Sequence, residues 1–298
     1  MSHSNYFAFA VLIGLATTIT SCSRDEVYSV SEKSRVSLNL RHFGIEQNAI
    51  TRATGTQDPH RIVFKAFDSS GKVAYETTQA SNQDGFGNLY FQLLPGEYTF
   101  VAVAHDVSAA ITDPTIAASI TSTSHATMPE ALVQDVFSKT MNVTINSGES
   151  FSADMTLPRI ISSFEIYLND KVPEGTKMFK IVANTAGSEV SDNASFNPST
   201  GLATINSQYV KEVDISAGIG KAGNHIGLNL FLNADEEDID ITASAYDAAG
   251  KLIISHELKG VPMKRNRATI AKGKFFTAKS SCSLSFQTDW SAKHEFGY

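Results

Sequence analysis

Cys22 stands where its thiol could be chemically modified. It follows an apolar run at residues 6–16, which is shorter than a membrane-spanning helix but has the length of an export-signal core. Residues 19–22 read Ile-Thr-Ser-Cys, an order typical of a lipobox, in which the cysteine receives a diacylglycerol before the leader is removed. We therefore predict a lipoprotein signal peptide over residues 1–21 and a lipid on Cys22. An ordinary signal peptide with a chance cysteine is the alternative, because residues 1–5 contain no Lys or Arg.

A lipid on Cys22 would leave Cys282 as the only other thiol, so the mature chain would have no internal disulfide. Its stability must then come from its core. The polar residues 22–34 are predicted to form a solvated tether that connects the lipid to the folded chain. The formal net charge of −7 argues against a nucleic-acid partner, since phosphate binding needs a basic surface.

Two further motifs could bind a ligand, and in each the context favours a structural role. Gly218, Gly220 and Gly223 match the dinucleotide-binding pattern GxGxxG, but an alternating strand follows where that site needs a helix. The acidic run 235–238 with Asp240 lacks the alternating ligands and central glycine of a calcium loop. The eight histidines are scattered without metal-ligand spacing, and no GxSxG motif occurs. We therefore expect no metal, no cofactor and no enzymatic activity.

Beyond residue 34 the apolar pattern has period two, which predicts strands rather than helices. Turn chemistry such as that of residues 68–71 separates the apolar runs, whereas residues 108–136 are less regular and could be a short helix or a long loop. The predicted strands are 36–40, 61–67, 89–93, 98–104, 139–145, 150–157, 160–168, 178–183, 209–215, 226–232, 239–246, 252–258, 268–276 and 283–290. Many short strands indicate the all-β sandwich class.

We predict two tandem antiparallel β-sandwich domains, over residues 35–157 and 158–298. Pro158 marks the boundary, because proline cannot continue a central strand. An internal sequence similarity supports a duplication: residues 66–73 read AFDSSGKV and residues 245–252 read AYDAAGKL. The Asp and Gly of both stretches suit a tight hairpin, so independent recurrence of a common turn is the alternative.

The stretch VPMKRNRATI at residues 261–270, followed by GKFF at 273–276, resembles the late-strand signature of the Bacteroidetes fimbrillin superfamily, the type V pilins and their anchor subunits. LPGEY at 94–98, PRII at 158–161 and the lipoprotein leader agree with this resemblance, which covers nearly the whole chain. It implies two transthyretin-like β-sandwich domains, export as a lipoprotein to the cell outer membrane, and a role as a structural subunit of an adhesive surface fimbrium. The partners would be other fimbrial subunits and, through the lipid on Cys22, the membrane.

In stalk pilins of this superfamily an Arg-specific protease cuts behind the first strand and removes it. Arg52, followed by Ala53, matches that position. Loss of the strand that carries Val36, Leu38 and Leu40 would uncover an apolar groove and leave unpaired backbone at a sheet edge. We therefore expect these three side chains to mark an acceptor groove that an incoming strand could fill.

The last strand of the sequence could be the donor. Even-numbered residues from 284 to 298 keep a largely apolar and bulky face up to the end of the chain. We predict that Trp290, Phe296 and Tyr298 on this face enter the groove of a neighbour. The alternative is that residues 284–290 form only the last core strand and that the final eight residues fray.

Two other functions stay open. The chain is short for a stalk pilin and closer in length to the lipid-retained anchor subunits, which keep their first strand and are not cut. A glycan-binding surface lipoprotein would need an exposed aromatic platform, for which the single Trp290 within a strand is poor support.

Overall fold

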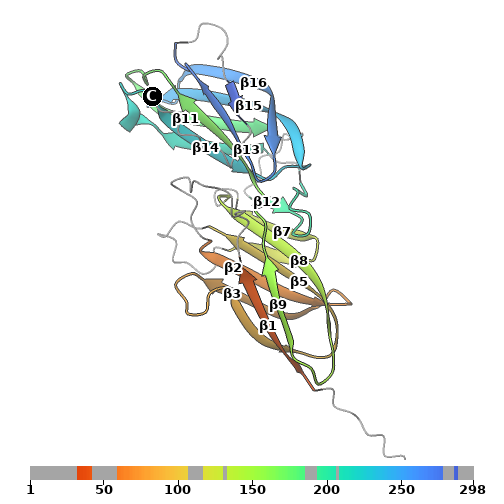
Figure 1. Cartoon of the computed structure of the whole chain (residues 1–298). Helices are drawn as coiled ribbons and strands as arrows, with labels where there is room; N and C mark the ends of the chain where they lie inside the picture. Colours follow the sequence, from red (N-terminus) through yellow and green to blue (C-terminus); the bar gives the residue numbers. More distant parts are fainter. Residues whose placement is uncertain are drawn as a thin grey trace, which may run out of the picture. The chain divides into compact units, whose positions relative to one another are not determined.

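The computed structural model describes residues 32–41, 59–106, 117–129, 133–184, 193–205, 208–277 and 285–287. Strands dominate these ranges, and the one helical element in them is a 3-10 turn at Ser216–Gly218 (Figure 1). No helix within the described ranges has the length and apolar character to span a membrane. The predicted all-β sandwich class is confirmed.

The first pair of sheets comes from residues 34–156. A three-stranded sheet has the order β4-β1-β9, and a four-stranded sheet has the order β3-β2-β5-β8. One apolar cluster fills the space between them and takes side chains from both sheets, such as Leu38 and Phe100. The strands are β1 (Ser34–Arg41), β2 (Arg61–Asp68), β3 (Val73–Ala80), β4 (Asn88–Leu93), β5 (Gly96–His105), β8 (Val136–Ile145) and β9 (Phe151–Thr156).

The second pair of sheets comes from residues 162–287. Its sheets have the orders β14-β10-β17-β18 and β13-β11-β15-β16, and a larger apolar cluster that includes Phe164 and Phe179 packs between them. The strands are β10 (Ser162–Leu168), β11 (Thr176–Asn184), β13 (Gln208–Asp214), β14 (Asn224–Leu230), β15 (Glu236–Asp247), β16 (Leu252–Lys264), β17 (Ala268–Gly273) and β18 (Ser285–Gln287).

A third sheet, of order β12-β7-β6, corrects the expectation for residues 108–136. Where a short helix or a loop was predicted, β6 (Ser119–Ser122) and β7 (His125–Pro129) form an antiparallel pair. Strand β12 (Asn193–Phe196) adds to β7 although it comes from beyond residue 158. The two halves of the chain thus share a sheet, which local patterning could not indicate because its strands lie far apart in the sequence. The domain boundary at Pro158 stays a prediction.

The two pairs of sheets repeat one strand arrangement. In the first, β1 lies between antiparallel β4 and parallel β9; in the second, β10 lies between antiparallel β14 and parallel β17. The other sheets correspond in the same chain order, with β3-β2-β5-β8 matching β13-β11-β15-β16. Strands β1 and β9, from opposite ends of the first half, run side by side in Figure 1.

The internal sequence similarity does not mark this repeat. Both turns have the same geometry: the Asp68 and Asp247 carboxylates each accept two backbone N–H bonds, and Gly71 and Gly250 have φ of 82° and 77°. The first turn joins β2 to β3 and the second joins β15 to β16. In the repeated arrangement β2 corresponds to β11, however, and β15 corresponds to β5. The two similar stretches therefore share a turn type, but they lie at positions that are not equivalent in the two pairs of sheets.

Strand β3 was not predicted, because it buries none of its side chains. Its burial alternates between exposed and half-buried positions, and it lies at the edge of its sheet. An edge strand with a polar sequence gives little apolar periodicity to detect.

His105, at the end of β5, is a buried histidine held in its neutral form. Its Nε2 accepts the N–H of Ala118 at 3.2 Å, and its Nδ1 lies 3.3 Å from the carbonyl oxygen of Asp106. A second proton on Nε2 would face that N–H group, which disfavours the charged ring. Burial lowers the pKa of His105 to about 4; the hydrogen bond with the Asp106 carbonyl opposes this shift, and the charge of Arg61 adds a smaller lowering.

Stability is therefore expected to fall as the pH drops from 6.5 to 4. In this window the unfolded chain protonates His105 at its ordinary pKa of about 6.5 while the folded chain does not, which costs about 1.4 kcal/mol per pH unit. Urea denaturation at several pH values measures this dependence. His105→Gln should flatten it, whereas His125→Gln, which removes a ring bonded to Thr204 at the surface, should not. An unchanged slope in the His105 variant would contradict the assignment.

Candidate functional site

Strand β1 fills the middle of the β4-β1-β9 sheet. It pairs with β4 from Ser34 to Asn39 and with β9 from Val36 to Arg41, so both of its edges are hydrogen-bonded over most of its length. The sequence predicted one unpaired edge after loss of this strand. The central position of β1 means that its removal would expose two facing edges instead, with a strand-wide groove between them.

The three predicted groove residues all point into the core. Val36, Leu38 and Leu40 are 2%, 1% and 4% exposed, and the residues between them face outward. This is the alternation that the sequence predicted, and the structure confirms it. Removing three such side chains from contact with the core would lose about 1.5–3 kcal/mol each.

Aromatic rings surround the Val36 end of the groove. Val36 pairs with Phe91 on β4 and with Phe151 on β9. The Phe91 ring stacks on Tyr75 at 4.2 Å and meets Phe100 at 5.8 Å, and Phe151 meets Phe100 at 6.1 Å. The other end is aliphatic: Leu38 lies between Leu89 and Ala153, and Leu40 pairs with Met155.

Just before the first residue of β4, Gly87 continues the wall of the groove. Its carbonyl oxygen accepts the N–H of Leu40 at 2.7 Å. A Cβ atom at Gly87 would lie 3.0 Å from the Leu40 oxygen, and the φ of 84° also disfavours other residues. The backbone at Gly87 therefore lies in direct contact with the backbone of β1, with little room for a side chain at position 87.

Strand β10 is the counterpart of β1 in the second half of the chain. Its inward side chains Phe164, Ile166 and Leu168 are likewise buried between two strands. It differs in its place in the chain, because folded strands precede and follow it. A single cut in the backbone could therefore release β1 but not β10.

The other predicted site residues lie outside the described residues. These are the lipid-attachment candidate Cys22, the processing candidates Arg52 and Ala53, and the donor candidates Trp290, Phe296 and Tyr298. Of the predicted functional segments, the acceptor strand β1 is therefore the one that lies within the described residues.

The GxGxxG stretch has the predicted structural role. A strand, β14, follows it, and the backbone N–H groups of Gly220 and Gly223 donate to Val172 and Leu168. The glycines thereby fasten one loop to another, and no helix N-terminus is present to hold a pyrophosphate.

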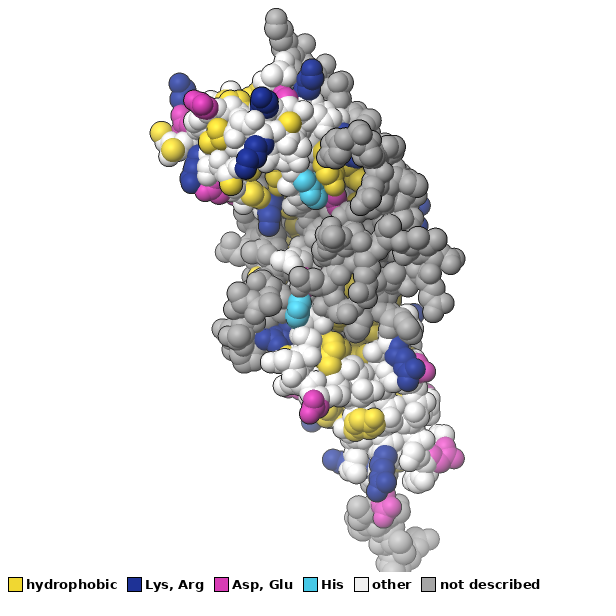
Figure 2. All heavy atoms as spheres, turned by 60° about the vertical axis from the view of Figure 1, so that its left-hand side comes forward, with side chains coloured by type: hydrophobic (Ala, Val, Ile, Leu, Met, Phe, Trp, Pro, Cys, Tyr) yellow, Lys and Arg dark blue, Asp and Glu magenta, His cyan; other side chains and the backbone are white. Residues whose placement is uncertain are grey.

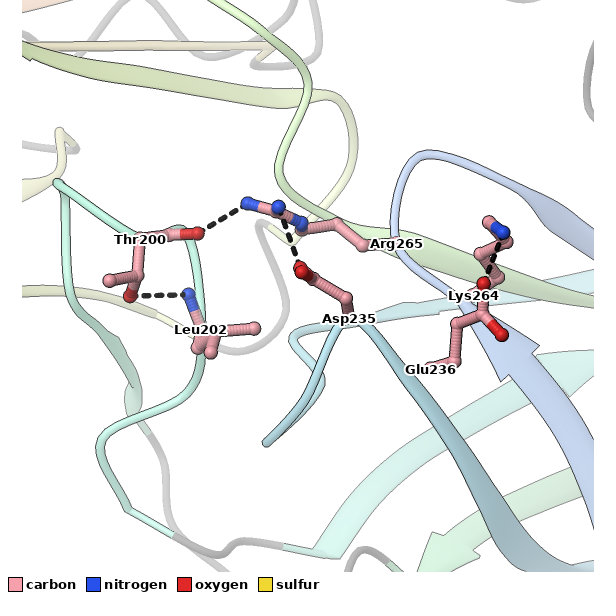
Figure 3. Close-up of polar contacts among 6 residues, drawn as sticks. All are labelled: Thr200, Leu202, Asp235, Glu236, Lys264 and Arg265. Atoms are coloured by element: carbon pink, nitrogen blue, oxygen red, sulfur yellow. Dashed lines mark hydrogen bonds and ion pairs between the residues drawn. The ribbon is translucent and has the colours of Figure 1, made fainter.

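The acidic run 235–240 and the basic turn in the resemblance motif bind one another (Figure 3). Arg265 pairs with Asp235 at 2.6 Å and also donates to the carbonyl oxygen of Thr200, while Lys264 pairs with Glu236. Asp240 pairs with Lys259. Within the described part of the chain, no group of three His, Cys, Asp or Glu side chains is arranged to hold a metal.

Asp170 is a buried residue that no sequence signal indicated. Burial alone would raise its pKa, but the backbone N–H groups of Phe275, Phe276 and Thr277 and the Thr277 hydroxyl all donate to the carboxylate at 2.8–3.0 Å, so the pKa lies below its ordinary value. This carboxylate fixes residues 275–277, the point from which the C-terminal segment leaves β17.

The outer face of the β4-β1-β9 sheet is polar with one exposed ring. Tyr90 is 75% exposed and pairs with Ser37, and Ser152 lies on the other side of Ser37. A hollow of about 450 Å³ opens over these residues, and Arg35 and Gln92 also line it. On the face drawn in Figure 2, the described basic and acidic side chains are interspersed and do not form a patch of one sign.

Comparisons with known proteins give one family and several distant structures. A family model described as a family of unknown function, DUF6562, matches residues 28–296. One similar solved structure is a candidate adhesin from Bacteroides ovatus, with 12% sequence identity, a TM-score of 0.49, and an alignment that covers 83% of this chain and 88% of that one. Another is the tip fimbrial protein Mfa3 from Porphyromonas gingivalis with a C-terminal truncation. It has 13% identity, a TM-score of 0.43, and an alignment that covers 87% of this chain and 100% of that one. A candidate polysaccharide-binding protein from Bacteroides thetaiotaomicron has 11% identity, coverages of 81% and 92%, and a TM-score of 0.46. Among curated proteins, none matches this sequence.

Proposed function

The chain belongs to DUF6562, a family of unknown function, and we propose from its architecture that it is a subunit of an adhesive surface fimbrium that joins a neighbouring subunit by exchange of β1. The observation that carries this proposal is the position of β1. It is the first described strand of the chain, it fills the centre of a sheet, and its apolar face is completely buried.

A strand in that position can be replaced without dismantling the rest of the fold. The walls β4 and β9 are each tied into the same half by chain connections that do not pass through β1. They run antiparallel to each other, so an incoming strand in either direction forms one parallel and one antiparallel ladder. Main-chain bonds on both sides, together with burial of three apolar side chains, would make such a joint long-lived.

The remaining parts of the proposal concern residues outside the described ranges. A lipid on Cys22 holds the exported chain at the cell outer membrane. A cut between Arg52 and Ala53 releases β1 together with this tether. The C-terminal face with Trp290, Phe296 and Tyr298 serves as the donor to another subunit.

The lipid-retained anchor is the second form of the same function. In it the Arg52–Ala53 bond stays intact, β1 remains in its sheet, and the subunit contributes only its C-terminal segment to the fimbrium. The role as a subunit is common to both forms, and the fate of the bond after Arg52 separates them.

Cleavage after Arg52 is expected to make β1 exchangeable. The purified chain is treated with an Arg-specific protease, which is then inhibited because the probe contains Arg35. The chain is next incubated with an excess of a labelled peptide of residues 34–41. Native mass spectrometry should show that the cut protein loses its N-terminal fragment and gains one peptide. The uncut protein should gain none, because the peptide would have to displace a β1 that stays covalently attached to the chain.

Arg52→Ala is the matched control, since it removes the cleavage site and leaves β1 unchanged. It should block both the cut and the uptake of peptide. Cleavage at Arg52 without any exchange would contradict the strand-exchange function. A bond that resists the protease in the folded chain would favour the anchor.

One observation favours a different function, the binding of glycans. The exposed Tyr90 ring beside the hollow on the outer face supplies the aromatic platform that this function needs, with hydroxyl, amide and guanidinium groups around it. Arg35 and Ser37 of β1 line the hollow, so exchange of β1 would alter it.

A further inference from the structure

We infer that the β1 groove accepts an aliphatic strand and rejects aromatic side chains, so that the strand which enters this subunit comes from a different protein and not from another copy of this chain. This inference rests on the proposed function and names the partner of the same groove. Its evidence is the size of the three inward positions compared with the side chains that the chain's own C-terminal segment offers.

The position of Val36 is enclosed by aromatic rings on the core side of the sheet. The side chain is 2% exposed and is flanked across the sheet by Phe91 and Phe151. The Phe91 ring is itself in contact with rings on three sides, at 5.5 Å from Phe64, 5.8 Å from Phe100 and 4.2 Å from Tyr75. A larger group at position 36 would have to displace this cluster, because a packed core holds no spare volume for it.

The next two positions are closed as well. Leu38 is 1% exposed and lies between Leu89 and Ala153 in the middle of the groove. Leu40 is 4% exposed and pairs across the sheet with Met155, which is also buried. The groove therefore has three positions of the size of Val, Leu and Leu at alternate residues.

The C-terminal segment offers no such set. Its even-numbered side chains from 284 to 298 are Leu, Phe, Thr, Trp, Ala, His, Phe and Tyr, and the odd-numbered ones between them are polar or glycine. Any three consecutive members of the even series include at least one aromatic ring. No register of this segment therefore fills the groove without forcing a ring into an aliphatic position.

A groove and a C-terminal segment that do not fit each other argue against a polymer in which the C-terminal segment of one copy fills the groove of the next. The groove requires a donor with alternating small aliphatic residues, supplied by a second kind of subunit. The C-terminal segment, with its aromatic side chains, requires a larger groove on that subunit or on a third. Each copy of this chain then binds only subunits of other kinds, so it occupies a single type of position in the fimbrium.

The test uses the full chain with the recognition sequence of a site-specific protease inserted between Arg52 and Ala53, so that opening does not depend on natural cleavage. After the cut, the protein is offered four labelled peptides in separate reactions. These are residues 34–41, residues 284–298, the 34–41 peptide with Leu38→Phe, and the 34–41 peptide with Ser37→Phe. The last one is the matched control, because Ser37 faces outward and a ring there meets no packed core.

Peptide 34–41 and its Ser37→Phe form are expected to exchange equally, while the Leu38→Phe form and peptide 284–298 should bind about tenfold more weakly or worse. Binding of 284–298 as tight as that of 34–41 would overturn the inference and leave strand exchange intact. Failure of all four peptides, including 34–41, would show that the groove is not an exchange site, and the proposed function would fall with the inference.

Discussion

Leu38→Asp is expected to lower the free energy of unfolding by about 4 kcal/mol or more, the largest effect of a single substitution at the groove. Leu38 is 1% exposed and occupies the middle of the central strand, between Leu89 and Ala153. The substitution removes about 1.5–3 kcal/mol of apolar burial and adds the cost of a carboxylate that has no cation within the surrounding apolar cluster. Urea denaturation followed by far-ultraviolet circular dichroism measures the change.

Ser37→Asp is the matched control for this prediction. Ser37 is the neighbour of Leu38 on the same strand, but its side chain faces outward beside Ser152. The same charge there should change the free energy of unfolding by about 0.5 kcal/mol or less. Equal destabilisation by both substitutions would mean that the alternation of β1 does not determine which side chains the core holds.

Asp135→Ala should cost about 3–5 kcal/mol, because it leaves the guanidinium of Arg159 buried without its carboxylate. The Arg159 Nε lies 2.9 Å from Asp135 Oδ1, the two side chains are 6% and 10% exposed, and the guanidinium also covers the Phe137 ring at 5.3 Å. Asp154→Ala is the control for a lost carboxylate: Asp154 pairs with Arg41 at the surface, so its loss should have little effect. Thermal and urea denaturation of both variants would compare them.

Replacing both members of the buried pair should restore most of this stability. Burial raises the pKa of Asp135 and lowers the pKa of Arg159, so for each group desolvation outweighs the attraction of its partner. An apolar pair of similar volume, Asp135→Leu with Arg159→Met, avoids that desolvation, and its stability should return to within about 1 kcal/mol of the original chain. A double variant as unstable as Asp135→Ala would show that the pair contributes through its own attraction.

The sequence by itself determined the strands that have a regular apolar face, and which of their faces is buried. It did not determine the polar edge strand β3 or the strands β6, β7 and β12 of the third sheet. The alternation of Val36, Leu38 and Leu40 predicted β1 and its buried face, because strand periodicity is local and depends only on successive side chains pointing to opposite sides. The turn at residues 68–71 and the strand after the GxGxxG stretch were predictable for the same reason. Each depends on residues within a few positions of one another.

Only the tertiary structure decided what those strands lie against. Contacts between distant segments place β1 between β4 and β9 and add β12 to β7. The same kind of contact brings Arg159 to Asp135. Alternation tells which face of a strand is buried but carries no label for its partner, and many pairings bury the same side chains equally well. The choice among them depends on how the volumes of the whole core fit together, and for β1 that fit is what makes it a central strand in a closely packed groove.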